Sequence, residues 1–162
     1  MTTVRLNIVF SGIDLDDDDV FDTMGTLSNV YWRSQGPLAF ATAIVDSDSA
    51  LAATALVVGQ VQELVPSALP IRLDEDLVAI PDIASRVGVS REAVRNWANG
   101  TRQSNFPIPK GIVGDGIKVW AWSSVSKWLN ANLNLGDQEE FPTELDTAEL
   151  NYKFSCPQIH SI

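Results

Sequence analysis

The chain is short of the residues that most often carry metal or redox chemistry. It has one cysteine, Cys156, and one histidine, His160, among 162 residues. A single cysteine excludes an intrachain disulfide framework, and we therefore expect a cytoplasmic protein. Cys156 and His160 are spaced like half of a metal site, but nothing completes it. We predict no metal ion and no cofactor.

Long apolar runs and a surplus of basic residues are also lacking. No apolar stretch reaches the roughly eighteen residues that span a bilayer, and no basic-then-apolar signal peptide opens the chain, so we expect no membrane partner. The chain has 11 basic and 21 acidic residues, which gives a formal net charge of −10, and 45% of it is hydrophobic. With a mean hydropathy of +0.04, this composition indicates a soluble globular protein of one or two domains.

The sequence also offers no catalytic constellation. The single histidine lies near the C-terminus, and no nucleophile–base pair, phosphate-binding loop or carboxylate pair has helpful spacing. We therefore expect that the protein is not an enzyme.

The acidic surplus is unevenly distributed. Residues 79–130 contain seven basic and three acidic residues, which gives +4, whereas the rest contains four basic and eighteen acidic residues, which gives −14. A basic segment within an acidic chain is what local neutralisation of phosphates requires. The acidic remainder repels DNA and should keep non-specific affinity low.

The clearest motif is the run IPDIASRVGVSREAVRNW at residues 80–97. Its apolar residues lie three or four apart, as on one face of each of two short helices. A helix-turn-helix needs a small residue where the helices cross, a residue that tolerates positive φ in the turn, and an apolar residue directly after it. Ala84, Gly88 and Val89 meet these needs, and Ser90 is a suitable N-cap for the second helix. The predicted motif core is Ala84, Gly88, Val89, Val94 and Trp97, with Ile83 and Val87 on the first helix.

In the DNA-binding form of this motif, the second helix enters the major groove and presents its N-terminal residues to base edges. That helix is predicted here at residues 90–98. Arg can bond guanine, Asn can bond adenine, and Glu can accept from cytosine. The predicted base contacts are Ser90, Arg91, Glu92, Arg95 and Asn96. The alternative is a solvated polar helix face, because paired helices also serve as protein–protein modules.

A hairpin is predicted directly after these helices. Residues 106–113 and 117–122 form its two strands, with glycines at the tip, and residues 107–122 act as a wing that reaches the DNA backbone or the minor groove. Asp115 at the tip argues against deep minor-groove insertion. The predicted backbone or wing contacts are Arg102, Lys110 and Lys118.

Three tryptophans follow the tip of this hairpin. Trp120 and Trp122 are expected on one face of its second strand, and Trp128 on a last helix that Ser123 or Ser124 caps. They could form a platform on which bases stack. Their alternation and helical spacing instead favour a small core.

The first 75 residues predict strands at 4–10, 28–34, 38–46 and 69–73, and helices near 20–27 and at 50–64. Pro70 would confine the last strand to a sheet edge. The expected apolar faces comprise Val4, Leu6, Ile8 and Phe10 on the first strand, Val20, Phe21 and Met24 on the first helix, and Leu51, Leu56, Val57, Val61 and Leu64 on the second. The order β-α-β-β-α-β is that of a ferredoxin-like domain, a fold shared by many functions.

Polar residues are expected to begin both helices. Asp46, Ser47 or Asp48 would cap the second helix. The aspartates before the first helix either bind a divalent cation or cap the helix, and they lack the Gly and Glu of a calcium loop. These aspartates are Asp14, Asp16, Asp17, Asp18 and Asp19.

The segment from Ile80 to Leu129 resembles the small winged helix-turn-helix domains of the excisionase, AlpA and MerR-like superfamily. The matching pieces are PDIASRVGVSREAVRNW, FPIP and VWAWSSVSKWL, within about fifty residues. Actinobacterial and phage-borne regulators with an acidic ferredoxin-like domain ahead of such a module look similar in layout. The resemblance implies a prokaryotic or phage protein that binds double-stranded DNA sequence-specifically, usually as a homodimer or cooperative array. It does not extend to the metal-sensing loops of MerR proteins, so it carries over no inducer.

We therefore expect an α+β protein in three parts. Residues 1–75 form a ferredoxin-like dimerisation or sensing domain, residues 76–132 the winged domain, and residues 133–162 an acidic tail. A helix near 142–154, with Leu145 and Leu150 facing inward, either pairs two protomers or gives way to disorder.

The leading function is a DNA-binding regulator of transcription, or a recombination directionality factor, that acts as a dimer. The alternative is a protein-interaction module of antitoxin, anti-repressor or DNA-mimic type, in which the acidic domain engages a protein partner.

Overall fold

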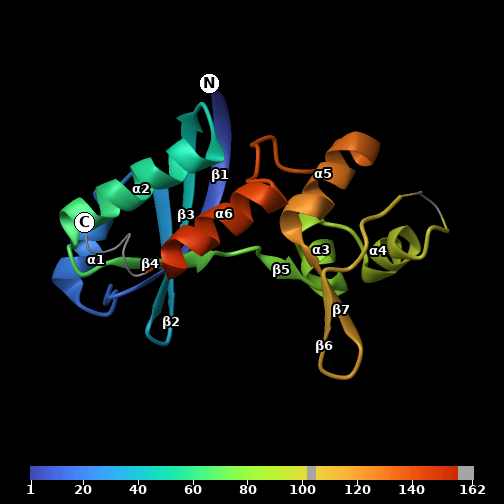
Figure 1. Cartoon of the computed structure of the whole chain (residues 1–162). Coiled ribbons are helices and arrows are strands. Elements are labelled where there is room, and N and C mark those ends of the chain that lie inside the picture. The colour runs from blue at the N-terminus through green and yellow to red at the C-terminus, as the bar shows by residue number, and fades with distance from the viewer. Residues whose placement is uncertain (102–104, 157–162) are drawn as a thin grey trace. The chain divides into compact units, whose positions relative to one another are not determined.

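The computed structural model describes residues 1–101 and 105–156 of an α+β protein. It divides the chain into two compact units, the first made of residues 1–74 together with the chain from Glu139 onward, and the second of residues 75–138 (Figure 1). Within the described ranges, no helix has the length and apolar character needed to cross a membrane. The elements in chain order are β1 (Thr2–Ser11), α1 (Asp18–Met24), β2 (Val30–Gln35), β3 (Leu38–Ser47), α2 (Ala50–Leu64), β4 (Leu69–Leu73), β5 (Leu77–Val78), α3 (Ile80–Val87), α4 (Arg91–Ala98), β6 (Gly111–Val113), β7 (Ile117–Ala121), α5 (Trp122–Leu133) and α6 (Glu144–Ser155).

The first unit is built on a four-stranded antiparallel sheet in the order β2-β3-β1-β4. Its first six elements follow the expected order β-α-β-β-α-β. The central pair, β1 and β3, stays in register from Thr2–Ser47 to Phe10–Ala39. β4 lies at an edge, as the proline at position 70 predicts, because proline cannot donate to a strand on that side.

Alternation along the strands places one face of this sheet in the core. All four β1 residues predicted to face inward are buried, and Ala53, Val57 and Val61 of α2 cover them. Three predicted core residues are wrong, because Phe21 is 58%, Leu56 49% and Leu64 37% exposed. The sheet contacts only a narrow stripe of α2, in which buried residues recur every four positions.

The helix caps of this unit are local and partly unexpected. Ser49 caps α2 by accepting a hydrogen bond from the N–H of Ala52, because β3 continues through Ser47 and leaves the earlier candidates outside the cap. Asp17 caps α1 in the same way, through the N–H of Val20. Helix capping is therefore sufficient to explain why an aspartate occupies position 17 of the acidic run.

The C-terminal segment is part of the first unit. The backbone of Glu140 bonds to Thr3 and Arg5 at the edge of β1. In α6, Leu150 is 5% exposed and joins the core, whereas Leu145 is 77% exposed, so its predicted inward orientation is wrong. Residues 133–138 instead belong to the second unit. The structure therefore divides the acidic tail between the two units.

The second unit contains a three-stranded sheet in the order β5-β7-β6, with α3, α4 and α5. The sequence did not predict β5, which has only two residues. The expected first strand of the hairpin is shorter than predicted, and only Gly111–Val113 pair with β7. Pro107 and Pro109 have no N–H to donate to a ladder.

Trp122 is the first residue of α5 rather than the end of a strand, which corrects the prediction. Its backbone N–H donates to the carbonyl of Asp76 at 3.1 Å, and its indole N–H donates to Asp137 at 2.7 Å. The N-cap is Ala121, with no side-chain bond, so neither predicted serine caps the helix. These partners lie 46 and 15 residues away along the chain, beyond the reach of a local capping rule.

The tryptophans of this unit form its core, as their spacing favoured. Trp120 is 2% and Trp128 6% exposed. Phe106 lies edge-on to both, with ring centroids 5.6 and 4.9 Å away, and Trp97 lies 5.6 Å from Trp128. Aromatic pairs in this geometry stabilise beyond the area that they bury. Because the tryptophan rings are buried in this cluster, they are not available for bases to stack on.

Candidate nucleic-acid interface

The predicted turn between α3 and α4 is present. Gly88 has a φ of +76°, which is the left-handed region that favours glycine. The N–H groups of Gly88 and Val89 donate to the carbonyl of Ala84 at 2.9 and 3.1 Å. Ala84 is 5% exposed, so its small side chain lets the helices approach each other. The motif core is confirmed at these positions.

Helix α4 has one buried and one exposed side. Ser90 caps it, with its Oγ accepting from the N–H of Ala93 at 3.1 Å. Val94 and Trp97 are buried and fix the helix against the core. The side chains left on the exposed side are those of Ser90, Arg91, Glu92 and Arg95. Four of the five predicted base contacts are therefore accessible at the N-terminal part of one short helix.

The fifth candidate, Asn96, is half-buried. Its backbone carbonyl accepts from both the N–H and the hydroxyl of Thr101 at 3.0 Å. Asn96 therefore closes the C-terminal end of α4 through its backbone, and its side chain is less accessible than those of the arginines.

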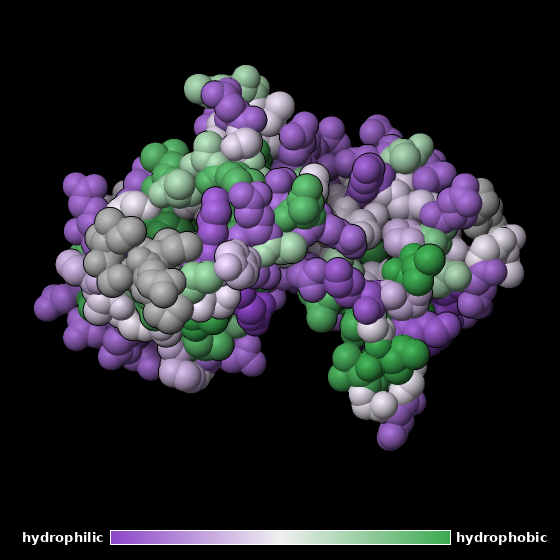
Figure 2. Space-filling model, viewed as in Figure 1, coloured by the Kyte–Doolittle hydropathy of each residue, from purple (hydrophilic) through white to green (hydrophobic). Residues whose placement is uncertain are grey.

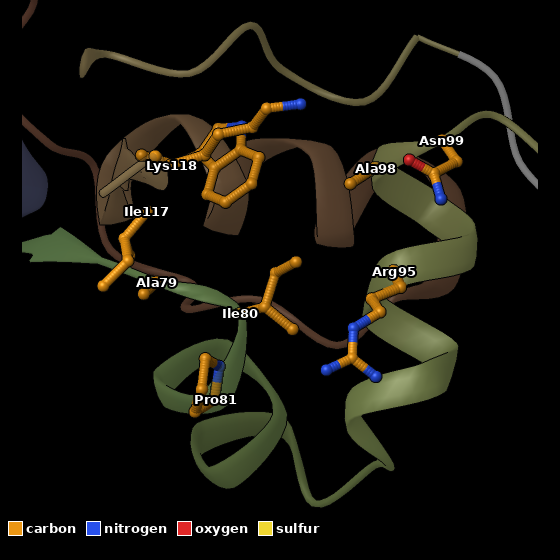
Figure 3. Close-up of a pocket in the computed structure, with 10 residues that line it drawn as sticks. Ala79, Ile80, Pro81, Arg95, Ala98, Asn99, Ile117 and Lys118 are labelled. Carbon is orange, nitrogen blue, oxygen red and sulfur yellow. The ribbon is translucent and has the colours of Figure 1, made fainter. Parts of the chain in front are cut away.

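A hollow of about 550 Å³ separates α4 from β7 (Figure 3). Arg95 extends from α4 on one side of it, and Lys118 comes from β7 on another. Ile80 lies between them in the close-up, at the beginning of α3. The lining residues are Ala79, Ile80, Pro81, Arg95, Ala98, Asn99, Gly116, Ile117, Lys118 and Trp120. The hollow is therefore lined mainly by apolar side chains, and Arg95 and Lys118 lie at its borders.

The β6–β7 hairpin differs from the expected phosphate-binding hairpin. Lys110, one of the predicted contacts, has its Nζ 2.9 Å from Oε1 of Glu75. The strands themselves expose apolar side chains, with Ile112 at 67%, Val113 at 54% and Ile117 at 57%. Figure 2 shows these apolar side chains gathered on the hairpin. On β6 and β7, Lys118 is the one basic side chain.

A second basic residue of the segment serves the fold. Arg86, in the last turn of α3, bonds both carboxylate oxygens of Asp76 at 2.6 and 2.9 Å. Its guanidinium lies 4.8 Å from the ring centre of Trp122. The hydrogen bond that Arg86 donates to Asp76 raises the pKa of Arg86, although burial opposes the shift. Arg86 therefore fixes α3 to the junction before β5, and it stays charged at any ordinary pH.

The bounds of the second unit change the expected charge balance, because they add Glu75, Asp76 and Asp137 to the segment that was counted. The second unit has seven basic and six acidic residues, so its formal charge is +1, and the first unit has four basic and fifteen acidic residues, or −11. Glu75 and Asp76 lie just outside the segment that was counted as +4. An acidic junction directly before a basic segment was the available signal that two of its cations would be paired.

The remaining cations fall into two groups. Arg91, Arg95 and Lys118 lie on or beside the exposed side of α4, and Lys127 is exposed on α5. Arg95 contacts Glu92 at 3.4 Å, but both side chains are more than half exposed, so this pair contributes little. Arg102 and His160 lie outside the described residues. Within the described ranges, no three His, Cys, Asp or Glu side chains are grouped as metal ligands.

Comparison with protein-family models, curated proteins and solved structures finds no match to this chain. The function is therefore inferred from the geometry and the charge distribution of the two units. The feature that combines both is the exposed side of α4 with Lys118 beside it.

Proposed function

We propose that the chain binds double-stranded DNA in a sequence-specific manner and acts as a transcriptional regulator. One observation supports this function: α4 is held by its buried residues Val94 and Trp97, while its capped N-terminal part exposes polar side chains. An α-helix fits the major groove, and a helix held in this way presents its first turns to base edges. In this proposal α4 is the recognition helix and the β6–β7 hairpin is the wing.

The accessible residues suit different parts of a site. Arg91 and Arg95 can each donate two hydrogen bonds to a guanine, and Glu92 can accept from a cytosine. Lys118 lies across the hollow from Arg95 and is placed to meet a phosphate. The apolar side chains of the wing suit contact with sugars in a groove better than contact with phosphates.

We further assign the first unit to the ferredoxin-like class, and the second to the winged domains that it resembles in sequence. The strand order β2-β3-β1-β4 and the element order support the first assignment. The α3–α4 turn and the hairpin after it support the second. One such helix contacts too few bases for useful selectivity, so the proposed regulator acts as a dimer.

Selection from a random duplex pool tests this proposal. The full chain is incubated with the pool at two salt concentrations, and bound duplexes are sequenced over several rounds. We expect a motif repeated with two-fold symmetry, and an affinity that falls with a log–log salt slope of about −0.9 for each phosphate neutralised. Absence of both enrichment and salt-dependent binding would overturn the proposal.

Charge reversal identifies the surface. Arg91→Glu and Arg95→Glu should each weaken binding to the selected duplex by roughly 5- to 150-fold, for the loss of a base contact. Lys118→Glu should also weaken binding, because it removes a phosphate contact. Lys127→Glu is the matched control, because Lys127 is exposed on α5 and does not line the hollow. An equal loss in all four variants would mean that only net charge matters.

A second candidate is a protein-interaction module. The exposed apolar side chains of the hairpin and the charge of −11 on the first unit favour it, because both suit contact with another protein. Under this function, the two charge reversals on α4, Arg91→Glu and Arg95→Glu, leave partner binding intact. The same variants therefore separate the two candidates.

A further inference from the structure

The sheet of the first unit has a face that its helices leave open. Core residues from α1, α2 and α6, among them Met24, Val57 and Leu150, all pack on the face that Leu6 and Ile8 occupy. Figure 1 shows α2 and α6 on the same side of the strands. The opposite face is exposed at Tyr31, Arg33 and Asp46 on β2 and β3, whereas Val9 on β1 is fully buried.

The open face has an unusual composition for so acidic a unit. The pairing registers place on it Arg5, Asn7 and Val9 of β1, Tyr31 and Arg33 of β2, Phe40, Thr42, Ile44 and Asp46 of β3, and Arg72 of β4. Three of the four basic residues of the unit therefore lie on this face, although the unit has fifteen acidic residues. Tyrosine, phenylalanine and arginine are enriched at protein interfaces, and acidic residues are depleted there.

One side chain on this face is already held in place for contact, and one aromatic ring is exposed. The guanidinium of Arg33 lies 4.2 Å from the ring centre of Phe40, on the neighbouring strand. Tyr31, which is paired with Thr42 on the neighbouring strand, is 66% exposed. An aromatic ring and a stacked arginine lose little conformational freedom when a partner covers them.

Charge is arranged lengthwise on the face. Arg33 lies at the Phe40 end of β3, while Asp46 lies at its other end and accepts from the hydroxyl of Thr3 at 2.6 Å. The other two arginines are matched locally, since Arg5 lies 3.4 Å from Glu139 and Arg72 lies 3.0 Å from Asp74. Arg33 has no ion pair with the described residues. The unmatched charges are thus a cation near one end and an anion near the other.

A surface with this polarity is complementary to itself. Consider a two-fold axis that lies in the plane of the interface and crosses the strands near Ala43. Rotation about this axis places the Arg33 end of each copy's face opposite the Asp46 end of the other, so the pairing of arginine with aspartate occurs twice. In the same arrangement, Tyr31 of each copy approaches Ile44 of the other. Such isologous contact is the usual symmetry of a homodimer.

We propose that two copies of this chain pair through the open sheet face, with the strands of the two sheets running in opposite directions. The paired faces would form an aligned sandwich, about 10 Å thick, with the aromatic side chains at its centre. This dimer rests on the proposed function, in which two copies bind one DNA site, and it adds the surface through which the two copies pair. The pairing itself needs no DNA and is tested without it.

Sedimentation equilibrium on the full chain, without nucleic acid, measures the pairing. We expect a dimer in the micromolar range or tighter, and a dissociation constant raised at least about tenfold by Tyr31→Ala, as for an aromatic residue at an interface centre. Tyr152→Ala is the matched control, because Tyr152 is 70% exposed on α6, which packs on the opposite face. A monomeric wild-type chain, or equal effects of the two variants, would overturn the proposal.

A charge exchange tests the arrangement directly. Arg33→Asp alone and Asp46→Arg alone should each impair self-association, because like charges then face each other across the axis. A mixture of the two variants should pair again, since each contact then joins an aspartate to an arginine. Recovery in the mixture also shows that both variants fold, and failure to recover, with circular dichroism unchanged, would overturn the arrangement.

Two further outcomes separate this inference from the rest. A dimer that follows these rules while selection enriches no duplex would leave the pairing standing and remove the proposed function. If the wild-type chain instead stays monomeric and binds a single-stranded oligonucleotide through Tyr31, the face is a base-stacking surface and the dimer proposal fails.

Discussion

The two units achieve stability by different means. The first buries alternating aliphatic residues of a four-stranded sheet beneath helices, and its many acidic residues lie outside that core. The second has a small sheet and relies on packed aromatic rings and on two ion pairs, Lys110–Glu75 and Arg86–Asp76. Charged residues therefore lie apart from the core in the first unit, whereas some of them hold elements together in the second.

This difference shows which basic residues are available for function. Arg86 and Lys110 are paired with carboxylates beside β5, whereas Arg91, Arg95 and Lys118 are exposed. Exposed substitutions of the latter kind usually change stability by less than about 0.5 kcal/mol. The proposed site can thus be altered without unfolding the unit that carries it.

The largest expected effect comes from removing the centre of the aromatic core. Trp120 is 2% exposed and its indole N–H donates to the carbonyl of Pro107 at 2.8 Å. Trp120→Ala should lower the free energy of unfolding by about 3–5 kcal/mol, and Leu6→Ala, at a fully buried position in the first unit, by about 2–5 kcal/mol. Urea denaturation followed by tryptophan fluorescence and circular dichroism measures both.

The two variants should also differ in function. Trp120→Ala should abolish duplex binding and leave self-association in place, whereas Leu6→Ala should weaken self-association. If Trp120→Ala abolished self-association as well, the pairing surface would depend on the second unit, and the contrast between the units would fail.

A smaller effect is expected where the chain leaves α5. A Cβ added to Gly136 would lie 2.1 Å from the carbonyl oxygen of Ser126, and the next residue, Asp137, donates its N–H to the hydroxyl of the same serine at 2.7 Å. Gly136→Ala should therefore cost about 1–3 kcal/mol in the free energy of unfolding, because the backbone must move. Thermal denaturation measures the loss.

The matched control for this change lies in the first unit. Gly59 is an exposed position in α2, with nothing within 4 Å of an added Cβ. Gly59→Ala should stabilise the protein by about 0.5–1 kcal/mol, because alanine loses less conformational freedom in a helix. A Gly136→Ala variant as stable as wild type would mean that the turn after α5 yields without strain.

Local signals predicted the first unit better than the second. An apolar helix face and Pro66 were sufficient to predict α2, whose observed bounds are the predicted ones. In the second unit, β5 forms only because two residues pair with β7 about forty positions later, and such a short strand has no periodicity to detect. Trp122 continues the alternation of β7, yet its contacts with Asp76 and Asp137 place it in a helix.

The candidate site was predictable to the extent that it depends on local rules. The left-handed turn at Gly88 and the cap at Ser90 are decided by neighbouring residues, so both were found. The pairing of Lys110 with Glu75 depends on how a hairpin folds back on the junction, and spacing alone does not reveal it. The apolar lining of the hollow, including Ile80, was missed for the same reason.

The smallest effect gives the finest comparison, because the two units contain the same cap. Ser90 Oγ accepts from the N–H of Ala93 at 3.1 Å, and Ser49 Oγ accepts from the N–H of Ala52 at 3.0 Å. Either serine changed to alanine leaves one first-turn N–H without its partner, so each variant should lose about 1 kcal/mol of stability.

Only Ser90→Ala should weaken binding to the selected duplex, because Ser90 caps the helix that carries the proposed base contacts, whereas Ser49 caps α2 on the other unit. Ser90→Asp sharpens the test, since aspartate caps a helix as well as serine does but places a negative charge at the N-terminus of α4. This variant should keep its stability and still bind the duplex less tightly. Equal duplex affinities for Ser90→Asp and wild type would show that the N-terminus of α4 does not approach DNA, and the proposed orientation of the recognition helix would then be wrong.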